Sequence, residues 1–346
     1  MRLRPPKLFP TRQLPTKLNN ERLAELAAVK LRALVTEHLD IQTAEVQRLG
    51  GGASCLADGE GWIYFPTTAS GMLGTASIWA RAHDCPQVNL IVDGNAGALA
   101  FAARGFADPV PVIWQSSGRD ISRAEAADPM IEPPPDCPDL TATLVASGLE
   151  VVPDHGVWIG ELNGLEVARV GSRDGECSMD IGVGAYDQFA AAALLPEAED
   201  RADSLDRVIE MVRPHRIAGS EPHAIGRLVR SRWLRAQLVR DPGALELESL
   251  EPIPLLVERP GLMENQPAAA IGNRADGSRV LVAFTVGLDL GIGETAAGLA
   301  ALHDPDEVLV VVPPRDHHQR IVDSVAALAK PALVVAVEGE WAAVSP

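Results

Sequence analysis

The chain has 346 residues, of which 47% are hydrophobic, and a net charge of −17 at neutral pH. This length exceeds that of a typical single domain, so two or three globular units with separate cores are expected. The negative charge argues against a protein that coats nucleic acid over its whole surface, because phosphate binding relies on concentrated lysine and arginine.

The positive charge is concentrated in two segments. Residues 1–20 contain five basic residues and no acid, and residues 212–240 contain seven arginines and one acid. This distribution predicts two local surfaces for anions on an otherwise acidic body. The alternative, equally favoured by the sequence, is that these arginines pair with carboxylates of the same chain.

The cysteines and the apolar runs indicate where the protein resides. No two cysteines have CxxC spacing and no signal segment precedes them, so reduced thiols in a cytoplasmic protein are expected. The apolar runs fall well short of the roughly 20 residues that span a bilayer, so no membrane association is expected. The four cysteines are Cys55, Cys85, Cys137 and Cys177.

The N-terminal part begins with prolines and basic residues over 1–18, which predict a flexible arm. A helix is expected from Asn20, where apolar residues recur every three to four positions. Short strands and helices then alternate, and this alternation predicts an α/β domain over 19–127 with a parallel strand pair.

A linker is predicted over 128–139, because five of these twelve residues are proline. A central region of a hairpin and helices is expected over 140–250, including helices from Tyr186 and over 204–212. A second α/β domain follows over 251–346. The predicted fold class is therefore α/β, with mixed sheets and strand-helix-strand units at both ends.

A repeat is only weakly indicated. When residues 88–120 are aligned with 284–316 without gaps, an aspartate, an Asp-Pro pair and an Arg-Asp pair coincide. Any two strand-helix-strand units align this well, so chance is the better explanation.

Acidic residues within two apolar strand-like runs, at 160–171 and 177–188, form the first candidate site. Hairpin pairing would bring Glu166 and Asp180 to one end of a sheet, where carboxylates bind hard divalent cations such as Mg²⁺ or Mn²⁺. The alternative is that Glu166 pairs with Arg169 or Arg173. The predicted metal ligands are Glu161, Glu166, Asp180 and Asp187.

This hairpin resembles the core of the restriction-endonuclease-like fold, in which one strand carries an acid and the next carries an acid, any residue and a lysine. The resemblance implies a metal-dependent nuclease with Glu166 and Asp180 as catalytic residues. Gly182 stands where the family has its lysine. Arg169 supplies a positive charge there but cannot act as a base, because a guanidinium does not lose its proton.

Arginines on one expected helix form the second candidate site. The pattern predicts that Leu228, Leu234 and Leu238 face a core while Arg227, Arg230 and Arg235 project together. Planar guanidinium groups bind phosphates bidentately. The alternative is an amphipathic surface helix paired with acidic neighbours. The predicted nucleic-acid-binding residues are Arg227, Arg230, Arg232 and Arg235.

Other motifs favour structure over chemistry. The loops over 93–97 and 288–294 follow strands but lack the GxGxxG and GKS/T patterns, so no nucleotide cofactor is predicted. The histidines at 215, 223, 317 and 318 do not have zinc-ligand spacing. We therefore expect tight turns at both glycine-containing loops.

The chain as a whole resembles a family of uncharacterised conserved actinobacterial proteins, through the segment GLEVARV, the Arg-Trp-Leu-Arg helix and the strand ending at Leu290. The resemblance implies a cytoplasmic bacterial protein and no particular activity. From the candidate sites we expect a protein that binds a phosphate backbone, with nucleic acid as partner and nuclease-like chemistry. The alternative is a non-enzymatic protein that binds a protein partner or acts as a regulatory scaffold.

Overall fold

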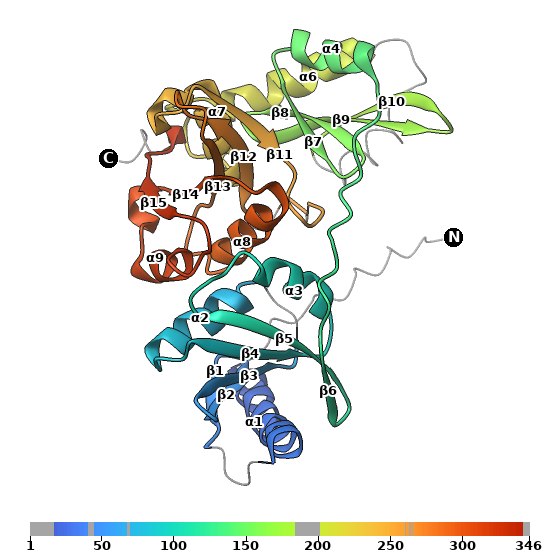
Figure 1. Cartoon of the computed structure of the whole chain (residues 1–346). Coiled ribbons are helices and arrows are strands. Elements are labelled where there is room, and N and C mark those ends of the chain that lie inside the picture. The colour runs from blue at the N-terminus through green and yellow to red at the C-terminus, as the bar shows by residue number, and fades with distance from the viewer. Residues whose placement is uncertain are drawn as a thin grey trace, which may run out of the picture.

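The computed structural model describes residues 17–40, 45–67, 70–183, 201–259, 261–262, 264 and 266–341. These residues form three sheets, each covered by helices (Figure 1). The predicted α/β class is confirmed, with mixed sheets at the two ends of the chain and an antiparallel sheet between them. In the described residues no helix is both long and apolar enough to cross a membrane.

The N-terminal unit, described from residue 17 to 127, contains a six-stranded sheet of order β1-β2-β3-β4-β5-β6. The pairs β3-β4 and β4-β5 are parallel and the others antiparallel. Its elements are α1 (Lys17–Leu39), β1 (Gln47–Leu49), β2 (Gly52–Ala57), β3 (Glu60–Phe65), α2 (Met72–Ala82), β4 (Gln87–Val92), α3 (Ala96–Ala103), β5 (Val110–Ser117) and β6 (Asp120–Arg123).

Two apolar layers enclose this sheet. Helix α1 packs on one face, because its buried residues Ala27, Leu31 and Leu34 recur at helical spacing. Helices α2 and α3 cover the other face. Strand β4 is buried along nearly its whole length, as expected for an inner parallel strand.

The central unit, residues 137–229, contains an antiparallel sheet of order β10-β9-β8-β7. Two helices supply its apolar cover, with Leu205, Ile209 and Val212 of the second packed on the sheet. The elements are α4 (Pro138–Ala146), β7 (Glu150–Asp154), β8 (Val157–Leu162), β9 (Leu165–Arg173), β10 (Glu176–Ile181), α6 (Arg201–Val212), η1 (Arg213–His215) and η2 (Ile225–Arg227). The helix predicted from Tyr186 lies outside the described residues.

A disulfide joins Cys137 to Cys177 and so ties the start of α4 to β10. The expectation of four reduced thiols was therefore wrong for this pair. Forty residues separate the two cysteines in the chain, and they meet because the start of α4 packs against the β9-β10 hairpin. Cys55 and Cys85 are free and buried.

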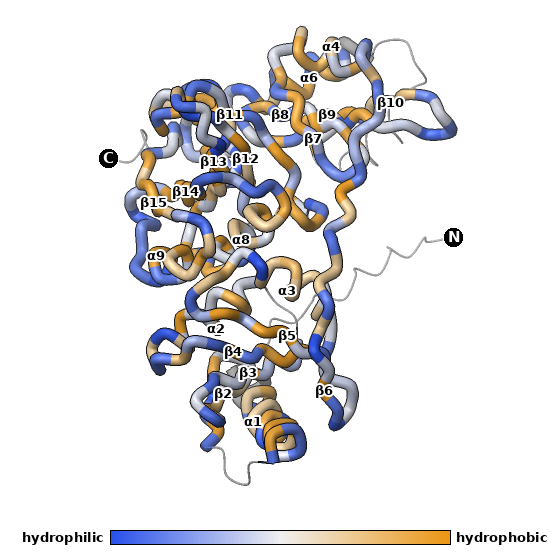
Figure 2. The backbone as a smooth tube through the Cα atoms, in the orientation of Figure 1, coloured by the Kyte–Doolittle hydropathy of each residue, from blue (hydrophilic) through white to orange (hydrophobic). Residues whose placement is uncertain are grey.

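The C-terminal unit, residues 230–341, contains a sheet of order β11-β12-β13-β14-β15, in which β13, β14 and β15 run parallel. Helix α7 covers one face, and α8 and α9 cover the other. The elements are α7 (Arg230–Arg240), η3 (Pro242–Leu245), β11 (Ser249–Ile253), β12 (Ala268–Asn273), β13 (Arg279–Phe284), α8 (Ile292–His303), β14 (Glu307–Val312), η4 (Pro314–Asp316), α9 (Gln319–Val325) and β15 (Ala332–Ala336). Figure 2 shows the apolar inner strands and the polar tip of the β9-β10 hairpin.

The two end units share one topology. Each runs through a helix, three antiparallel strands and two helix-strand crossovers, so that α1 corresponds to α7, β4 to β14 and β5 to β15. The gap-free alignment of 88–120 with 284–316 had the wrong offset, because it matches β4 with the end of β13. At the structural offset, Asp84 and Asp304 are equivalent, and both have positive φ after a helix.

The two units meet through a nearly symmetric joint. Helices α2 and α3 pack against α8 and α9 in one apolar cluster. At its side, Phe106 and the equivalent Leu328 form an antiparallel bridge. The flanking hydrogen bonds are reciprocal: Ala107 N donates to Ala327 O at 3.0 Å and Ala329 N donates to Gly105 O at 2.8 Å. This exchange of equivalent groups is the geometry of a two-fold interface between identical surfaces.

Candidate functional site: arginine and carboxylate clusters around helix α7

Glu161 and Glu166, expected within one strand-like run, lie opposite each other on two strands, β8 and β9. A bulge at this point places one extra residue, Val167, in β9. Both carboxylates are buried: Glu161 is completely inaccessible and Glu166 is 3% exposed. Buried carboxylates need partners, and the partners decide what the site does.

The partners of Glu161 are guanidinium groups. One of its oxygens accepts from Arg235 of α7 and the other from Arg259, at 2.6 Å. These two positive charges hold the pKa of Glu161 below its ordinary value, although burial acts in the opposite direction. Both oxygens of Glu161 are thus engaged by arginines, and its assignment as a metal ligand stays a prediction.

Glu166 pairs with Arg169 at 3.1 Å, which is the alternative that the sequence left open. Asp180 of β10 lies directly across from Arg169 in the strand register, and it is exposed. Asp187 lies outside the described residues. Among the residues that the structure describes, no group of three His, Cys, Asp or Glu side chains is placed to hold a metal ion. The assignment of Glu166, Asp180 and Arg169 to catalysis stays a prediction.

Helix α7 does not present its arginines on one surface. Arg232 and Arg235 are 3% and 2% exposed, whereas Arg230 is half-buried and Arg227 is exposed. The expected joint projection of Arg227, Arg230 and Arg235 was therefore wrong. The reason is that α7 is covered on both sides, by its own sheet and by the β8-β9 turn of the central unit.

Gly164 in that turn shows how close the cover lies. Its φ is +77° and a β-carbon at this position would be 2.3 Å from the carbonyl carbon of Arg232. Only glycine permits both the left-handed conformation and the close approach. The neighbouring Asn163 contacts Arg240 through its side chain, at 2.6 Å. The central sheet is thus anchored on α7 by backbone proximity and by charge.

A further arginine, Arg216, is completely buried, and the sequence did not single it out for this role. Its guanidinium donates to the carbonyl oxygens of Leu228, at 2.8 Å, and Asn163, and lies 4.2 Å from the centre of the Trp233 ring. Burial lowers its pKa to about 9. The sequence signal was weak, because an arginine after a Pro-His pair in a loop is normally exposed.

Two of the predicted arginines do join a surface cluster, together with Arg315 of η4, which the sequence analysis did not consider. Ser231 Oγ of α7 accepts from Val286 N at 3.2 Å, and Asp316 accepts from Gly287 N at 2.7 Å. These contacts place the start of α7 and η4 at the carboxyl ends of β13 and β14. We call Arg227, Arg230 and Arg315 the edge arginines.

The positive charges of the edge arginines interact with one another. Partial burial lowers the pKa of Arg230, and the positive charges of Arg315 and Arg227 lower it further, while Asp316 acts in the opposite direction. Arg230 also lies 5.5 Å from the centre of the Trp341 ring. The carboxyl edge of a parallel sheet is where ligands bind in open α/β folds.

The equivalent edge of the N-terminal unit carries a neutralised group. Asp93 accepts from Lys30 at 2.8 Å and from Tyr64 at 2.7 Å. Despite partial burial, these bonds keep the pKa of Asp93 below its ordinary value. The loop after β4 therefore has its charge satisfied within the chain, in agreement with the expected structural turn.

Comparison with known proteins returns no match: no family model, no curated protein and no solved structure corresponds to this chain. The resemblances to actinobacterial proteins and to the restriction-endonuclease-like core stay predictions.

Proposed function

We propose that this protein binds the phosphate groups of a nucleic acid through the edge arginines and does not cleave it. The observation that carries the proposal is that Arg230 and Arg315, from two separate segments, flank the carboxyl ends of two parallel strands. Guanidinium groups are suited to phosphate oxygens in both charge and shape.

Binding without cleavage follows from the partners of the hairpin carboxylates. Glu161 is bonded to two arginines and Glu166 to one, so neither offers a free carboxylate to Mg²⁺ or Mn²⁺. Arg169 cannot replace the lysine of the nuclease pattern as a base.

The test is fluorescence anisotropy with labelled single-stranded and duplex DNA and RNA across a salt series. Three phosphate contacts predict a slope of about −2 to −3 in a plot of log affinity against log salt. The variant Arg230→Gln/Arg315→Gln should bind at least about tenfold more weakly, and its slope should be shallower by about two. Arg173→Gln, at an exposed position on the β9-β10 hairpin, is the matched control.

Equal affinities for the double variant and the control would overturn the proposed site, and an absence of binding at low salt would overturn the proposed ligand. Gel analysis of the same mixtures with manganese tests the second part. Cleavage that disappears in Glu166→Ala/Asp180→Ala would restore the nuclease-like reading.

An acidic protein surface is the second candidate partner. The net charge of −17 repels a long polyanion, whereas three arginines suffice for a small group of carboxylates on another protein. This partner would be favoured if polyglutamate displaces the labelled nucleic acid from the wild type but has no such effect on the double variant.

A further inference from the structure

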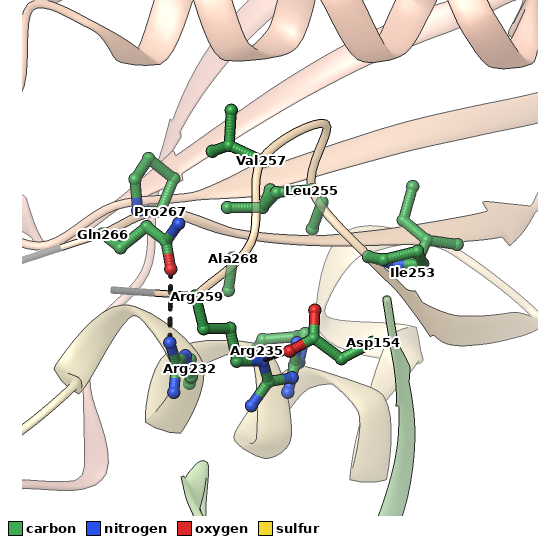
Figure 3. Close-up of a pocket in the computed structure, with 12 residues that line it drawn as sticks. Asp154, Arg232, Arg235, Ile253, Leu255, Val257, Arg259, Gln266, Pro267 and Ala268 are labelled. Atoms are coloured by element: carbon green, nitrogen blue, oxygen red, sulfur yellow. Dashed lines mark hydrogen bonds and ion pairs between the residues drawn. The ribbon is translucent and has the colours of Figure 1, made fainter. Parts of the chain in front are cut away.

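A small pocket lies between the central sheet and the C-terminal unit, away from the edge arginines (Figure 3). It holds about 260 Å³, counting the space open to solvent at its mouth, and its deepest part has room for one water-sized group. Organic ligands usually need a pocket of roughly 300 to 1,000 Å³. The size therefore favours an ion or a water molecule over a metabolite.

Three arginines and one aspartate supply the charges of the pocket lining: Arg232, Arg235, Arg259 and Asp154. Figure 3 shows these side chains close together beneath the loop that follows β11. Arg259 has full compensation, because it pairs with Asp154 at 2.8 Å and with Glu161 at 2.6 Å. Glu161 also serves Arg235. The charge of Glu166, which pairs with Arg169, acts on Arg232 and Arg259 as well, so three carboxylates face four guanidinium groups.

The uncompensated charge falls on Arg232 and Arg235. Within the described part of the chain, Arg232 forms no ion pair, and its bond to Gln266 at 3.2 Å is to a neutral amide. Arg235 is paired through one nitrogen, but its Nε is buried and has no hydrogen-bond partner among the described residues. A buried donor left unsatisfied is destabilising, and more so when it is charged.

The electrostatic state of Arg232 is consistent with a missing negative charge. Burial lowers its pKa to about 10, and the positive charges of Arg259 and Arg235 contribute, against the opposing effects of Glu161 and Glu166. An anion beside Arg232 would relieve both the burial and the like-charge repulsion.

We propose that this pocket binds a small inorganic monoanion, of which chloride is the simplest, beside the guanidinium groups of Arg232 and Arg235. A monatomic anion matches a pocket that has room for about one water-sized group. A multivalent oxyanion is disfavoured by its size and by the carboxylate of Asp154. Because Asp154 belongs to β7 and the arginines belong to α7, the ion joins the central unit to the C-terminal one.

The direct test is a crystal of the full chain soaked in bromide, which replaces chloride and scatters anomalously. We expect an anomalous peak within about 3.5 Å of the Arg232 and Arg235 nitrogens. Absence of a peak in this pocket would overturn the proposal.

The solution test is the thermal unfolding midpoint measured in sodium chloride and in sodium gluconate at equal ionic strength, since gluconate is too large to enter. The midpoint should rise with chloride concentration and not with gluconate. A bromide peak without this difference would mean an adventitious ion only, and would also overturn the proposal.

Two variants connect the effect to the pocket. Arg232→Gln should abolish the chloride dependence. Gln266→Glu places a carboxylate beside Arg232, so it should raise the midpoint in gluconate and remove the response to chloride, even if Arg232→Gln fails to fold. A chloride response retained in Gln266→Glu would contradict the assignment. Arg48→Gln, at an exposed position in the N-terminal unit, is the control.

Discussion

Helices α1 and α7 occupy equivalent positions in two units of the same topology, yet their outer faces differ. The outer face of α1 is exposed and carries Leu26 and Val29, 60% and 66% accessible. The outer face of α7 is covered by the β8-β9 turn and bears buried arginines. A row of arginines on a helix can therefore mark a buried contact with a covering layer as well as an exposed surface. The residues that form this covering layer lie far away in the sequence.

The largest loss of stability is expected at Glu161, where ion pairs hold the central sheet on α7. Glu161→Ala leaves Arg235 and Arg259 buried without their shared partner, and this type of loss costs about 3–5 kcal/mol. Urea unfolding should show it. Glu25→Ala removes the exposed ion pair between Glu25 of α1 and Arg48 of β1, and it should change stability by less than about 1 kcal/mol. Similar losses in both variants would break the comparison between the two helices.

The next effect concerns the disulfide, which has no counterpart in the end units within the described residues. Replacing both Cys137 and Cys177 by serine should cost about 2–4 kcal/mol, because the bond closes a loop of about 40 residues. Hydrogen exchange should increase in residues 138–181 and not in the N-terminal unit. Mass spectrometry that finds four free thiols in the purified protein would contradict the bond. Adding a reductant should have no effect on the stability of the double variant.

A third prediction concerns a carboxylate at the joint between the units. Glu294 of α8 accepts from Leu73 N of α2 at 3.0 Å, and its equivalent in α2 is Gly74. Burial raises the pKa of Glu294 from 4.5 to about 7, and nearby Asp289 contributes. Between about pH 4.5 and 7, the folded chain therefore keeps a proton on Glu294 that the unfolded chain has released.

Stability should consequently fall as pH rises from about 4.5 to 7 and level off above that, by on the order of 3 kcal/mol. Glu294→Gln cannot ionise, so this variant should lack the decline and should be more stable than the wild type at pH 8. Parallel pH profiles of unfolding for the two proteins would refute the role of this residue.

The smallest effect is expected on the open face of α1. Leu26→Glu should alter the free energy of unfolding by no more than about 0.5 kcal/mol, since the side chain is largely in water. Leu31→Glu, one turn away on the buried face, is the destabilising control. A large loss in Leu26→Glu would show that another surface covers this face in solution.

The sequence predicted the elements whose pattern is local. Helix α1, the inner strands β4 and β14 and the β9-β10 hairpin follow from apolar spacing and turn residues. It also grouped Glu161 with Glu166, although it placed both in one strand-like run and not on the two paired strands β8 and β9.

What the sequence could not predict was the identity of partners that come from far along the chain. Arg235 and Arg259 reach Glu161 across 74 and 98 residues. The repeat of topology was missed for a similar reason: equivalent elements share their burial pattern but few identical residues, and the alignment without gaps was offset.

The reciprocal bonds around Phe106 and Leu328 have a consequence for concentration. A joint with two-fold geometry between separate chains would form only above its dissociation constant, whereas here both halves are covalently linked. The connection gives each half an effective local concentration of its partner in the millimolar range or above. The apolar surfaces of α2, α3, α8 and α9 are therefore kept together at any dilution of the protein.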